Sequence, residues 1–242
     1  MNRPLEDLTA VVTGASSGIG RATASLLAQS GARVFLIGRR QAVLEDVAAA
    51  CGSLASAYPC DLTDDGQLRT LVTRVQADAA KLDVLVHSSG IINLGTTQDA
   101  PLADLDEQYA ANVRAPYLLT QSLIPILRTS RGQVVFVNSS VTRAANVAGR
   151  GTYAASQQAL HSIANALRDE VNELGIRVTN VFPGTTATDR QIKLHAMSGR
   201  RYDADRMLQP EDVAQAVLFA LTIGRTAEVT DIHLRPMLKP LP

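Results

Sequence analysis

A glycine-rich turn near the N-terminus constrains the fold of this chain more than any other stretch. Residues 13–20 read Thr-Gly-Ala-Ser-Ser-Gly-Ile-Gly, follow an apolar run at residues 10–12 and precede a predicted helix at residues 21–29. Glycines at this spacing let the backbone turn sharply out of a strand and approach a bound pyrophosphate closely. The N–H groups and the positive end of the following helix would face that anion. The turn therefore predicts a phosphate-binding strand–loop–helix unit, and a tight glycine turn without a ligand is the alternative.

Apolar runs and amphipathic segments alternate along the rest of the chain. Strands are predicted at residues 34–37, 54–59, 83–86, 133–137, 176–181 and 230–234. Helices are predicted at residues 41–50, 65–81, 104–128, 210–221 and from Tyr153 up to Gly175. No linker, repeat or low-complexity segment interrupts the alternation. We therefore expect one Rossmann-like α/β domain over residues 1–242, a doubly wound parallel sheet of about seven strands with helices on both faces and ligands at the C-terminal strand edge.

The composition argues against several classes of partner. Lys and Arg number 23 and so do Asp and Glu, so the charge balance does not indicate a nucleic-acid or acidic-lipid surface. No apolar run approaches the roughly 20 residues of a membrane helix, and residues 1–9 lack the apolar core of a signal peptide. Cys51 and Cys60 lack CxxC spacing and the histidines are scattered, so no metal cluster is predicted and both cysteines are interpreted as structural. We expect a cytoplasmic protein that acts on a small-molecule substrate.

The end of the second predicted strand indicates which dinucleotide would bind. In dinucleotide-binding βαβ units an acidic residue there holds the adenosine ribose hydroxyls, whereas a basic residue accepts a 2′-phosphate. This chain has Arg39 and Arg40 at that place and no carboxylate. The pair favours NADP(H) over NAD(H), unless the two arginines simply begin the exposed face of the next helix. Asp61 and Leu62 close the third strand, where a carboxylate could bind the adenine amino group.

Two polar side chains share the inward stripe of the helix that follows residue 153. At 100° per residue, Tyr153 and Gln157 lie about 40° apart and both point into the protein. Ser140 ends the fifth predicted strand thirteen residues before Tyr153. A hydroxyl pair at a strand end and a helix start can stabilise and protonate an oxygen that becomes negative during hydride transfer. For Tyr153 taken alone, a buried side chain with a satisfied hydroxyl is the alternative.

Several of these motifs together carry a resemblance. The chain resembles the short-chain dehydrogenase/reductase family along nearly its whole length, through the 13–20 turn, Asn112, Ser140, Tyr153 and the Pro-Gly-Thr-Thr-Ala-Thr stretch at residues 183–188. The resemblance implies that Tyr153 exchanges a proton with a carbonyl or alcohol oxygen while Ser140 hydrogen-bonds that oxygen. It also implies that Asn112 holds a proton-relay water.

The same resemblance implies a set of cofactor-binding residues, with Asp61 at the adenine and Thr188 at the nicotinamide amide. The full set is Gly14, Ser16, Ser17, Gly18, Ile19, Gly20, Arg39, Arg40, Asp61, Leu62, Gly90, Gln157, Pro183, Gly184 and Thr188. Residues 189–208 resemble the family's mobile substrate lid. The family's two long helices imply a homodimer or homotetramer, with outward residues around 168–173 at the contact.

The chain departs from the family pattern at the end of the fourth strand. The family usually carries Asn-Asn-Ala-Gly there, whereas this chain carries His87, Ser88, Ser89 and Gly90. Gly90 preserves the close backbone approach to the cofactor. We interpret His87 as structural rather than catalytic.

A larger departure lies four residues after Tyr153, where the family carries lysine and this chain carries Gln157. The lysine binds the nicotinamide ribose hydroxyls and favours the tyrosinate through its charge, and Gln157 can perform only the first task. Because a neutral phenol still donates a proton, alcohol oxidation should suffer more than carbonyl reduction, although both should slow. His161, Arg143 or Arg150 could replace the missing cation, and an exposed surface position is the alternative for each.

These residues predict an NADP(H)-dependent oxidoreductase that transfers a hydride to a ketone or aldehyde. One alternative is a reductase of an imine, a quinone or an activated C=C bond, in which the substrate or solvent supplies the proton. The other is a catalytically weakened NADPH-binding regulatory protein that has kept the fold.

Overall fold

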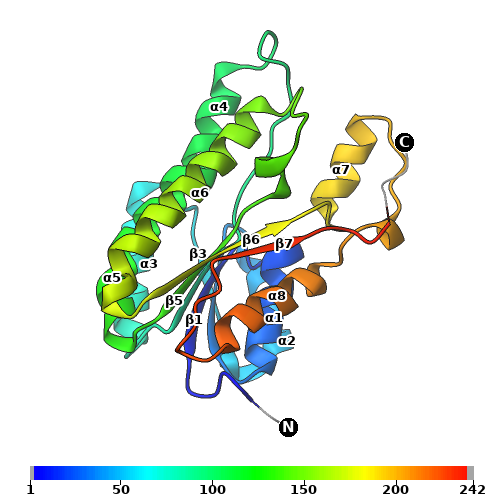
Figure 1. The fold of residues 1–242 in the computed structure, drawn as a ribbon. Helices are drawn as coiled ribbons and strands as arrows, with labels where there is room; N and C mark the ends of the chain where they lie inside the picture. Colours follow the sequence, from blue (N-terminus) through cyan, green and yellow to red (C-terminus); the bar gives the residue numbers. More distant parts are fainter. Residues whose placement is uncertain (1–2, 239–242) are drawn as a thin grey trace.

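A sheet of seven parallel strands forms the centre of the computed structural model, which describes residues 3–238 of the chain (Figure 1). The strand order is β3-β2-β1-β4-β5-β6-β7. The strands are β1 (Thr9–Thr13), β2 (Arg33–Gly38), β3 (Ala55–Pro59), β4 (Val84–His87), β5 (Gln133–Val137), β6 (Arg177–Pro183) and β7 (Asp231–Leu234). The order reverses between β1 and β4, so the crevice at their C-terminal ends is where a doubly wound sheet binds ligands.

Helices connect the strands and cover both faces of the sheet. The α-helices are α1 (Gly18–Gln29), α2 (Gln41–Cys51), α3 (Asp65–Asp78), α4 (Leu102–Tyr109), α5 (Ala115–Ser130), α6 (Gly151–Val171), α7 (Asp189–Met197) and α8 (Pro210–Thr222). Shorter turns of helix are η1 (Gly52–Leu54), η2 (Ala110–Arg114), η3 (Ser140–Arg143), η4 (Asn172–Leu174) and η5 (Ala204–Arg206). The predicted doubly wound α/β fold is confirmed.

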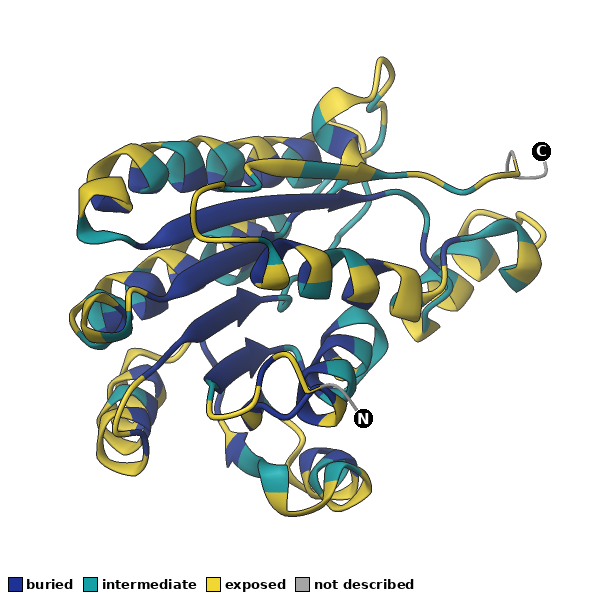
Figure 2. Ribbon diagram, turned by 60° about the horizontal axis from the view of Figure 1, so that its bottom comes forward, coloured by how far each residue is buried: buried dark blue, intermediate teal, exposed yellow. Residues whose placement is uncertain are grey.

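Each face of the sheet has its own hydrophobic core. On β2, Phe35 and Ile37 pack with α3, α5 and α6, whereas Val34 and Leu36 pack with α1, α2 and α8. Figure 2 shows that the central strands are buried while the outer faces of the helices are exposed. Because both faces of a parallel sheet are covered, its strands read as continuous apolar runs, which is why the segment 133–137 was recognisable in the sequence.

The helix predicted over residues 104–128, with bends expected at Pro116 and Pro125, is not one regular α-helix. The segment consists of α4, a π-helical turn at η2 and then α5. Pro116 has no N–H to donate to the carbonyl of Asn112, four residues earlier, so a regular α-helix cannot pass through this point. The wider turn at η2 accommodates the break, and Asn112 in its middle is buried.

Candidate functional site

The glycine-rich loop between β1 and α1 has a backbone that other residues could not adopt. Gly14 and Gly18 have positive φ angles of 67° and 52°. A Cβ on Gly14 would lie 2.8 Å from the Ser88 carbonyl oxygen, and a Cβ on Gly20 would collide with the Gly14 carbonyl. The hydroxyl of Thr13 accepts hydrogen bonds from the N–H groups of Ser88 at 3.0 Å and Ser89 at 3.1 Å. The loop therefore rests on the end of β4, at the switch point of the sheet.

The N-terminus of α1 is built to receive an anion. Ser17, its N-cap residue, makes no side-chain capping hydrogen bond, and the first turn of this helix contains no acidic residue. The first N–H groups of a helix need partners from outside it. A dinucleotide diphosphate held by this loop and helix end fits both observations.

Two arginines and an aspartate lie at the ends of the neighbouring strands. After β2, Arg39 is exposed, and Arg40 Nη2 donates a hydrogen bond to Ser16 Oγ in the phosphate loop at 3.1 Å. After β3, Asp61 Oδ1 accepts hydrogen bonds from the N–H and the hydroxyl of Thr63, at 3.0 and 2.7 Å. The second carboxylate oxygen of Asp61 has no hydrogen-bond partner among residues 3–238. The Leu62 side chain is buried in the core, so only its backbone could meet an adenine.

The side chain of Asn112 bonds to two neighbouring segments, the loop after β4 and helix α6. Its Oδ1 accepts a hydrogen bond from the Ile91 N–H at 2.8 Å, and its Nδ2 donates to the Ile91 carbonyl at 2.9 Å and to Ser156 Oγ at 3.0 Å. The Ser156 hydroxyl donates in turn to the Tyr153 carbonyl at 2.8 Å. This network fixes the loop after β4 to the turn of α6 that carries Tyr153. A cofactor-side role of Gly90 agrees with its tight packing, because a Cβ there would lie 3.0 Å from Asn112 Oδ1.

The hydroxyls of Ser140 and Tyr153 form no hydrogen bond with any described residue. Ser140 begins η3 and is exposed, while Tyr153 lies in the first turn of α6 and is half-buried. The neighbouring Ser139 caps η3, since its Oγ accepts a hydrogen bond from the Val141 N–H at 3.2 Å. Gln158 Nε2 on α6 donates to the Thr142 carbonyl in η3 at 2.7 Å, which holds the two elements together.

Gln157 is only 5% exposed, yet its side-chain amide has no hydrogen-bond partner in the described part of the chain. Its main chain is fixed, because Asn138 Nδ2 at the end of β5 donates to the Gln157 carbonyl at 3.2 Å. The amide atoms are not among the fully buried polar atoms that lack a partner, so they remain accessible from outside the protein. An accessible amide at this place can bond to a ligand that carries hydroxyl groups.

The three side chains predicted as substitutes for the missing lysine have other neighbours. The His161 ring packs edge-on against Phe182, and its Nε2 lies 3.7 Å from an Asp231 carboxylate oxygen. Arg150 Nη2 donates to the Asn146 carbonyl at 3.0 Å. The pKa of His233 on β7 is lowered, first by burial and then by the nearby charge of Arg143.

His87 faces the core rather than the crevice. Its Nε2 lies 2.7 Å from Thr120 Oγ1, and its ring stacks on Phe136 at 4.9 Å between centroids. Burial lowers the pKa of His87 to about 3, so the ring is neutral at physiological pH. These contacts agree with the structural role predicted for it.

The segment predicted as a lid begins against the phosphate loop. Thr188 is the N-cap of α7, and its methyl carbon lies 3.1 Å from where a Cβ on Gly18 would stand. Thr186 and Leu208 pair as a parallel bridge, which closes the base of the segment 189–208. Before it, Pro183 pairs with Leu234 of β7, and a Cβ on Gly184 would lie 3.0 Å from Pro236 Cδ.

Two residues near this site carry no motif and were missed from the sequence. Arg190, in the first turn of α7, donates a hydrogen bond through Nη2 to the Gly90 carbonyl, 100 positions earlier. Ser156 links Asn112 to Tyr153, as described above. The only available signal for Arg190 was its place two residues after Thr188.

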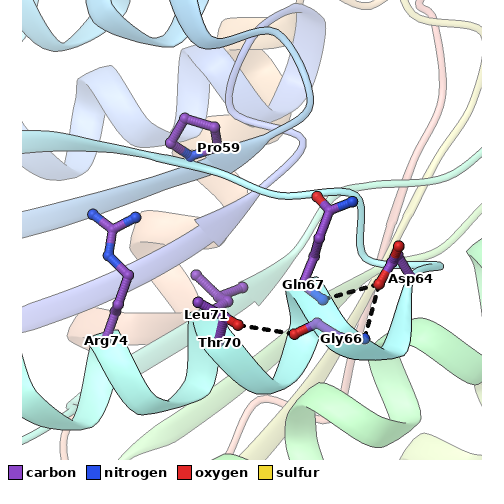
Figure 3. Close-up of a pocket in the computed structure, with 7 residues that line it drawn as sticks. All are labelled: Pro59, Asp64, Gly66, Gln67, Thr70, Leu71 and Arg74. Carbon is purple, nitrogen blue, oxygen red and sulfur yellow. Dashed lines mark hydrogen bonds between the residues drawn. The ribbon is translucent and has the colours of Figure 1, made fainter.

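A cavity of about 360 Å³ lies between α3 and the end of β3 (Figure 3). Its walls contain none of the predicted site residues; they are Pro59, Asp64, Gly66, Gln67, Thr70, Leu71 and Arg74. Arg74 is held over the Tyr58 ring, 4.6 Å from the ring centroid.

Over residues 3–238, no group of three or more His, Cys, Asp or Glu side chains is arranged to hold a metal ion. No helix in that range is long and apolar enough to cross a membrane. Cys51 and Cys60 are both free thiols.

Comparison with known proteins assigns the family. A family model described as short chain dehydrogenase matches residues 8–199. An uncharacterized oxidoreductase of Staphylococcus aureus (strain USA300) is 31% identical over 240 residues, which cover 96% of this chain and 99% of that protein. The chain belongs to the short-chain dehydrogenase family and is one of its oxidoreductases.

Solved structures of the same fold contain nicotinamide cofactors. A 3-ketoacyl-(acyl-carrier-protein) reductase from Brucella melitensis, complexed with NADH, aligns with a TM-score of 0.85 at 26% identity. A short chain dehydrogenase from Burkholderia cenocepacia J2315, in complex with NADP, aligns with a TM-score of 0.84 at 33% identity. Each alignment covers 96% of this chain and 98% of the other. A nicotinamide dinucleotide is therefore the kind of cofactor that this fold and site fit.

Proposed function

We propose that the protein is an NADP(H)-dependent oxidoreductase that transfers a hydride to the carbonyl carbon of a ketone or aldehyde. The observation that carries this proposal is the pair of hydroxyls on Ser140 and Tyr153. Neither hydroxyl has a hydrogen-bond partner within residues 3–238, and both stand on elements joined to each other at the C-terminal edge of the sheet. Tyr153 serves as the proton donor, and Ser140 stabilises the oxygen that becomes negative.

The preference for NADP(H) rests on Arg39 and Arg40. The related structures hold NADH in one case and NADP in another, so the fold alone does not decide. The hydrogen bond from Arg40 to Ser16 keeps a guanidinium beside the phosphate loop, where a 2′-phosphate would extend from the adenosine ribose. In the same assignment, the open carboxylate oxygen of Asp61 accepts from the adenine amino group. The bound cofactor supplies the hydride.

The remaining site residues orient the reaction. Gln157 binds the nicotinamide ribose hydroxyls through its unpartnered amide, and Thr188 binds the nicotinamide amide. Both N–H groups of the Asn112 side-chain amide are used by Ile91 and Ser156, and its oxygen already accepts one hydrogen bond from Ile91. We assign the water to the Asn112 main-chain carbonyl, whose α-helical donor is missing because residue 116 is proline.

The absence of a lysine beside Tyr153 gives the proposed reaction a direction. Gln157 carries no charge that would favour the tyrosinate, so Tyr153 acts mainly as a neutral acid. Carbonyl reduction needs that acid, whereas alcohol oxidation needs its conjugate base. The enzyme is therefore assigned as a reductase.

The proposal also covers the organisation of the protein. Residues 1–242 form one domain, with 189–208 as the substrate lid, and the protein works in the cytoplasm on a small molecule. Exposed aromatic side chains on α5 and α8, Tyr117 and Phe219, support assembly into a homodimer or homotetramer.

Gln157 also favours a second candidate. A chain that binds NADPH through an intact phosphate loop but lacks the cation beside Tyr153 could serve as a weakened, regulatory NADPH-binding protein. A third candidate function is the reduction of an imine, a quinone or an activated C=C bond. The substrate or solvent would then supply the proton, and Tyr153 would be dispensable.

One experiment separates these candidates. NADPH consumption is measured with ketones, aldehydes, quinones and imines for the wild type and for Gln157→Lys, Tyr153→Phe and Gln121→Lys. Gln121 is exposed on α5, so its variant controls for an added lysine. The proposal expects wild-type turnover of a ketone or aldehyde that Tyr153→Phe abolishes. Turnover that survives Tyr153→Phe indicates the imine or quinone class. An inert wild type made active by Gln157→Lys indicates the regulatory protein.

A further inference from the structure

We propose that Arg190 binds the diphosphate of the nucleotide cofactor and so joins helix α7 to it. The inference rests on the proposed binding of a nicotinamide dinucleotide. It adds a cation on the lid segment to the cofactor site, which the glycine loop and the arginines after β2 otherwise form.

The position of Arg190 is fixed from both sides of the crevice. On one side, Thr188 packs against Gly18, so the first turn of α7 stands beside the phosphate loop. On the other side, the guanidinium of Arg190 reaches the Gly90 carbonyl at the end of β4. The Arg190 side chain therefore crosses the space between the phosphate loop and the loop after β4, where a diphosphate on the α1 N-terminus would lie.

The charge of Arg190 is not balanced by a carboxylate. Within residues 3–238 its side chain forms no ion pair, and its hydrogen-bond partner is a neutral carbonyl. A guanidinium bonds more strongly, and with two N–H groups at once, to a phosphate. The loop itself, residues 13–20, contains no Lys or Arg. A diphosphate bound there would contact N–H groups and the N-terminus of α1. Arg190, on α7, supplies the full positive charge.

The two cationic positions should recognise different parts of the cofactor. Arg40 contacts Ser16, the fourth residue of the 13–20 turn, and with Arg39 it serves the 2′-phosphate. Arg190 follows two residues after Thr188, which packs against Gly18 at the start of α1. The 2′-phosphate distinguishes NADPH from NADH, whereas the diphosphate is common to both. Arg190 must therefore contribute equally to the binding of the two nucleotides.

The test measures binding rather than turnover. Dissociation constants of NADPH and NADH are determined by calorimetry for the wild type, Arg190→Met, Arg190→Lys and Lys193→Met. Lys193 is an exposed cation on the same helix that we place outside the cofactor site, and it serves as the matched control. We expect Arg190→Met to weaken both nucleotides by roughly 10- to 100-fold, Arg190→Lys to recover part of the loss, and Lys193→Met to change neither by more than about two-fold.

The outcomes distinguish this inference from the proposed function. If the wild type binds neither nucleotide, the proposed function fails and the inference with it. If the wild type binds NADPH and Arg190→Met binds it equally well, the inference alone is overturned. A loss confined to NADPH would place Arg190 at the 2′-phosphate and overturn it as well. Thermal unfolding without nucleotide checks folding, and should Arg190→Met not fold, Arg190→Lys must still weaken both nucleotides.

Discussion

Asn112 Nδ2 donates a hydrogen bond to Ser156 Oγ at 3.0 Å, between a π-helical turn and the helix that carries Tyr153. Both residues are buried, and both make a second hydrogen bond to the backbone. The catalytic tyrosine proposed here is thus positioned by residues that need not touch a substrate.

Replacing Asn112 should lower the stability of the fold more than replacing Ser156. Asn112→Ala leaves the N–H and carbonyl of Ile91 without partners and should cost about 2–4 kcal/mol of the free energy of unfolding. Ser156→Ala removes one hydroxyl with two bonds and should cost about 1 kcal/mol. Urea unfolding of both variants measures the difference. Equal midpoints for the wild type and Asn112→Ala would show that the network does not stabilise the fold.

Alanine in the phosphate loop should be tolerated far less than alanine at an open glycine. Gly20→Ala forces a methyl group against the Gly14 carbonyl, so we expect a loss of about 1–3 kcal/mol or more and no measurable NADPH binding. Gly224 has open space where its Cβ would stand and an ordinary φ angle. Gly224→Ala is therefore the control and should leave NADPH binding unchanged in the same titration. Normal binding by Gly20→Ala would contradict the loop geometry described here.

The arginine after β2 should set the preference between the two nucleotides. Arg40→Ala removes a charge from the place assigned to the 2′-phosphate, and we expect NADPH affinity to fall by roughly 10-fold while NADH affinity stays constant. Arg128→Ala, on the exposed end of α5, controls for the loss of one positive charge. Parallel titrations with NADPH and NADH measure the ratio. An equal loss of affinity for NADPH and NADH would show that Arg40 does not bind the 2′-phosphate.

Acid should destabilise the protein partly through His87. Burial lowers the pKa of His87 to about 3 in the folded state, whereas an unfolded histidine titrates near 6.5. Between these values only the unfolded state binds the proton, so stability decreases as the pH falls below about 6.5, by about 1.4 kcal/mol per pH unit at most from this group. His87→Gln should flatten the slope of unfolding free energy between about pH 4 and 6. Identical slopes for the variant and the wild type would rule out this contribution.

The strands of the sheet could be predicted because a strand buried on both faces is a short, continuous apolar run in the sequence. The segment Gln133–Val137 occurs with the predicted bounds, and the glycine loop lies at the switch point of the sheet as expected. A bend at Pro116 was predicted but the π-helical turn at η2 was not, because propensity alone does not show whether a proline bends a helix or changes its pitch.

The contact between Arg190 and Gly90 lies beyond sequence reasoning for a different reason. The two residues are 100 positions apart, and neither periodicity nor a motif relates them. The same holds for the side-chain partners of Asn112: the residue is predicted to hold a water, and nothing in the sequence indicates that its side chain bonds to Ile91 and Ser156. Family motifs identify which residues matter, but the tertiary fold decides which atoms remain free.

The bridge between Thr186 and Leu208 has a consequence for how the protein could change over time. The Ala187 N–H donates to the Leu208 carbonyl at 2.7 Å, and the Leu208 N–H donates to the Thr185 carbonyl at 3.0 Å. The chain thus leaves the end of β6 and reaches the start of α8 with the two ends of the segment held together by these hydrogen bonds. Insertions or exchanges within the segment alter loop entropy only slowly with length and leave the strands undisturbed. Apart from Arg190, to which we assign a role in cofactor binding, the segment is in effect a replaceable cassette, through which the proposed substrate lid can change without refolding of the core.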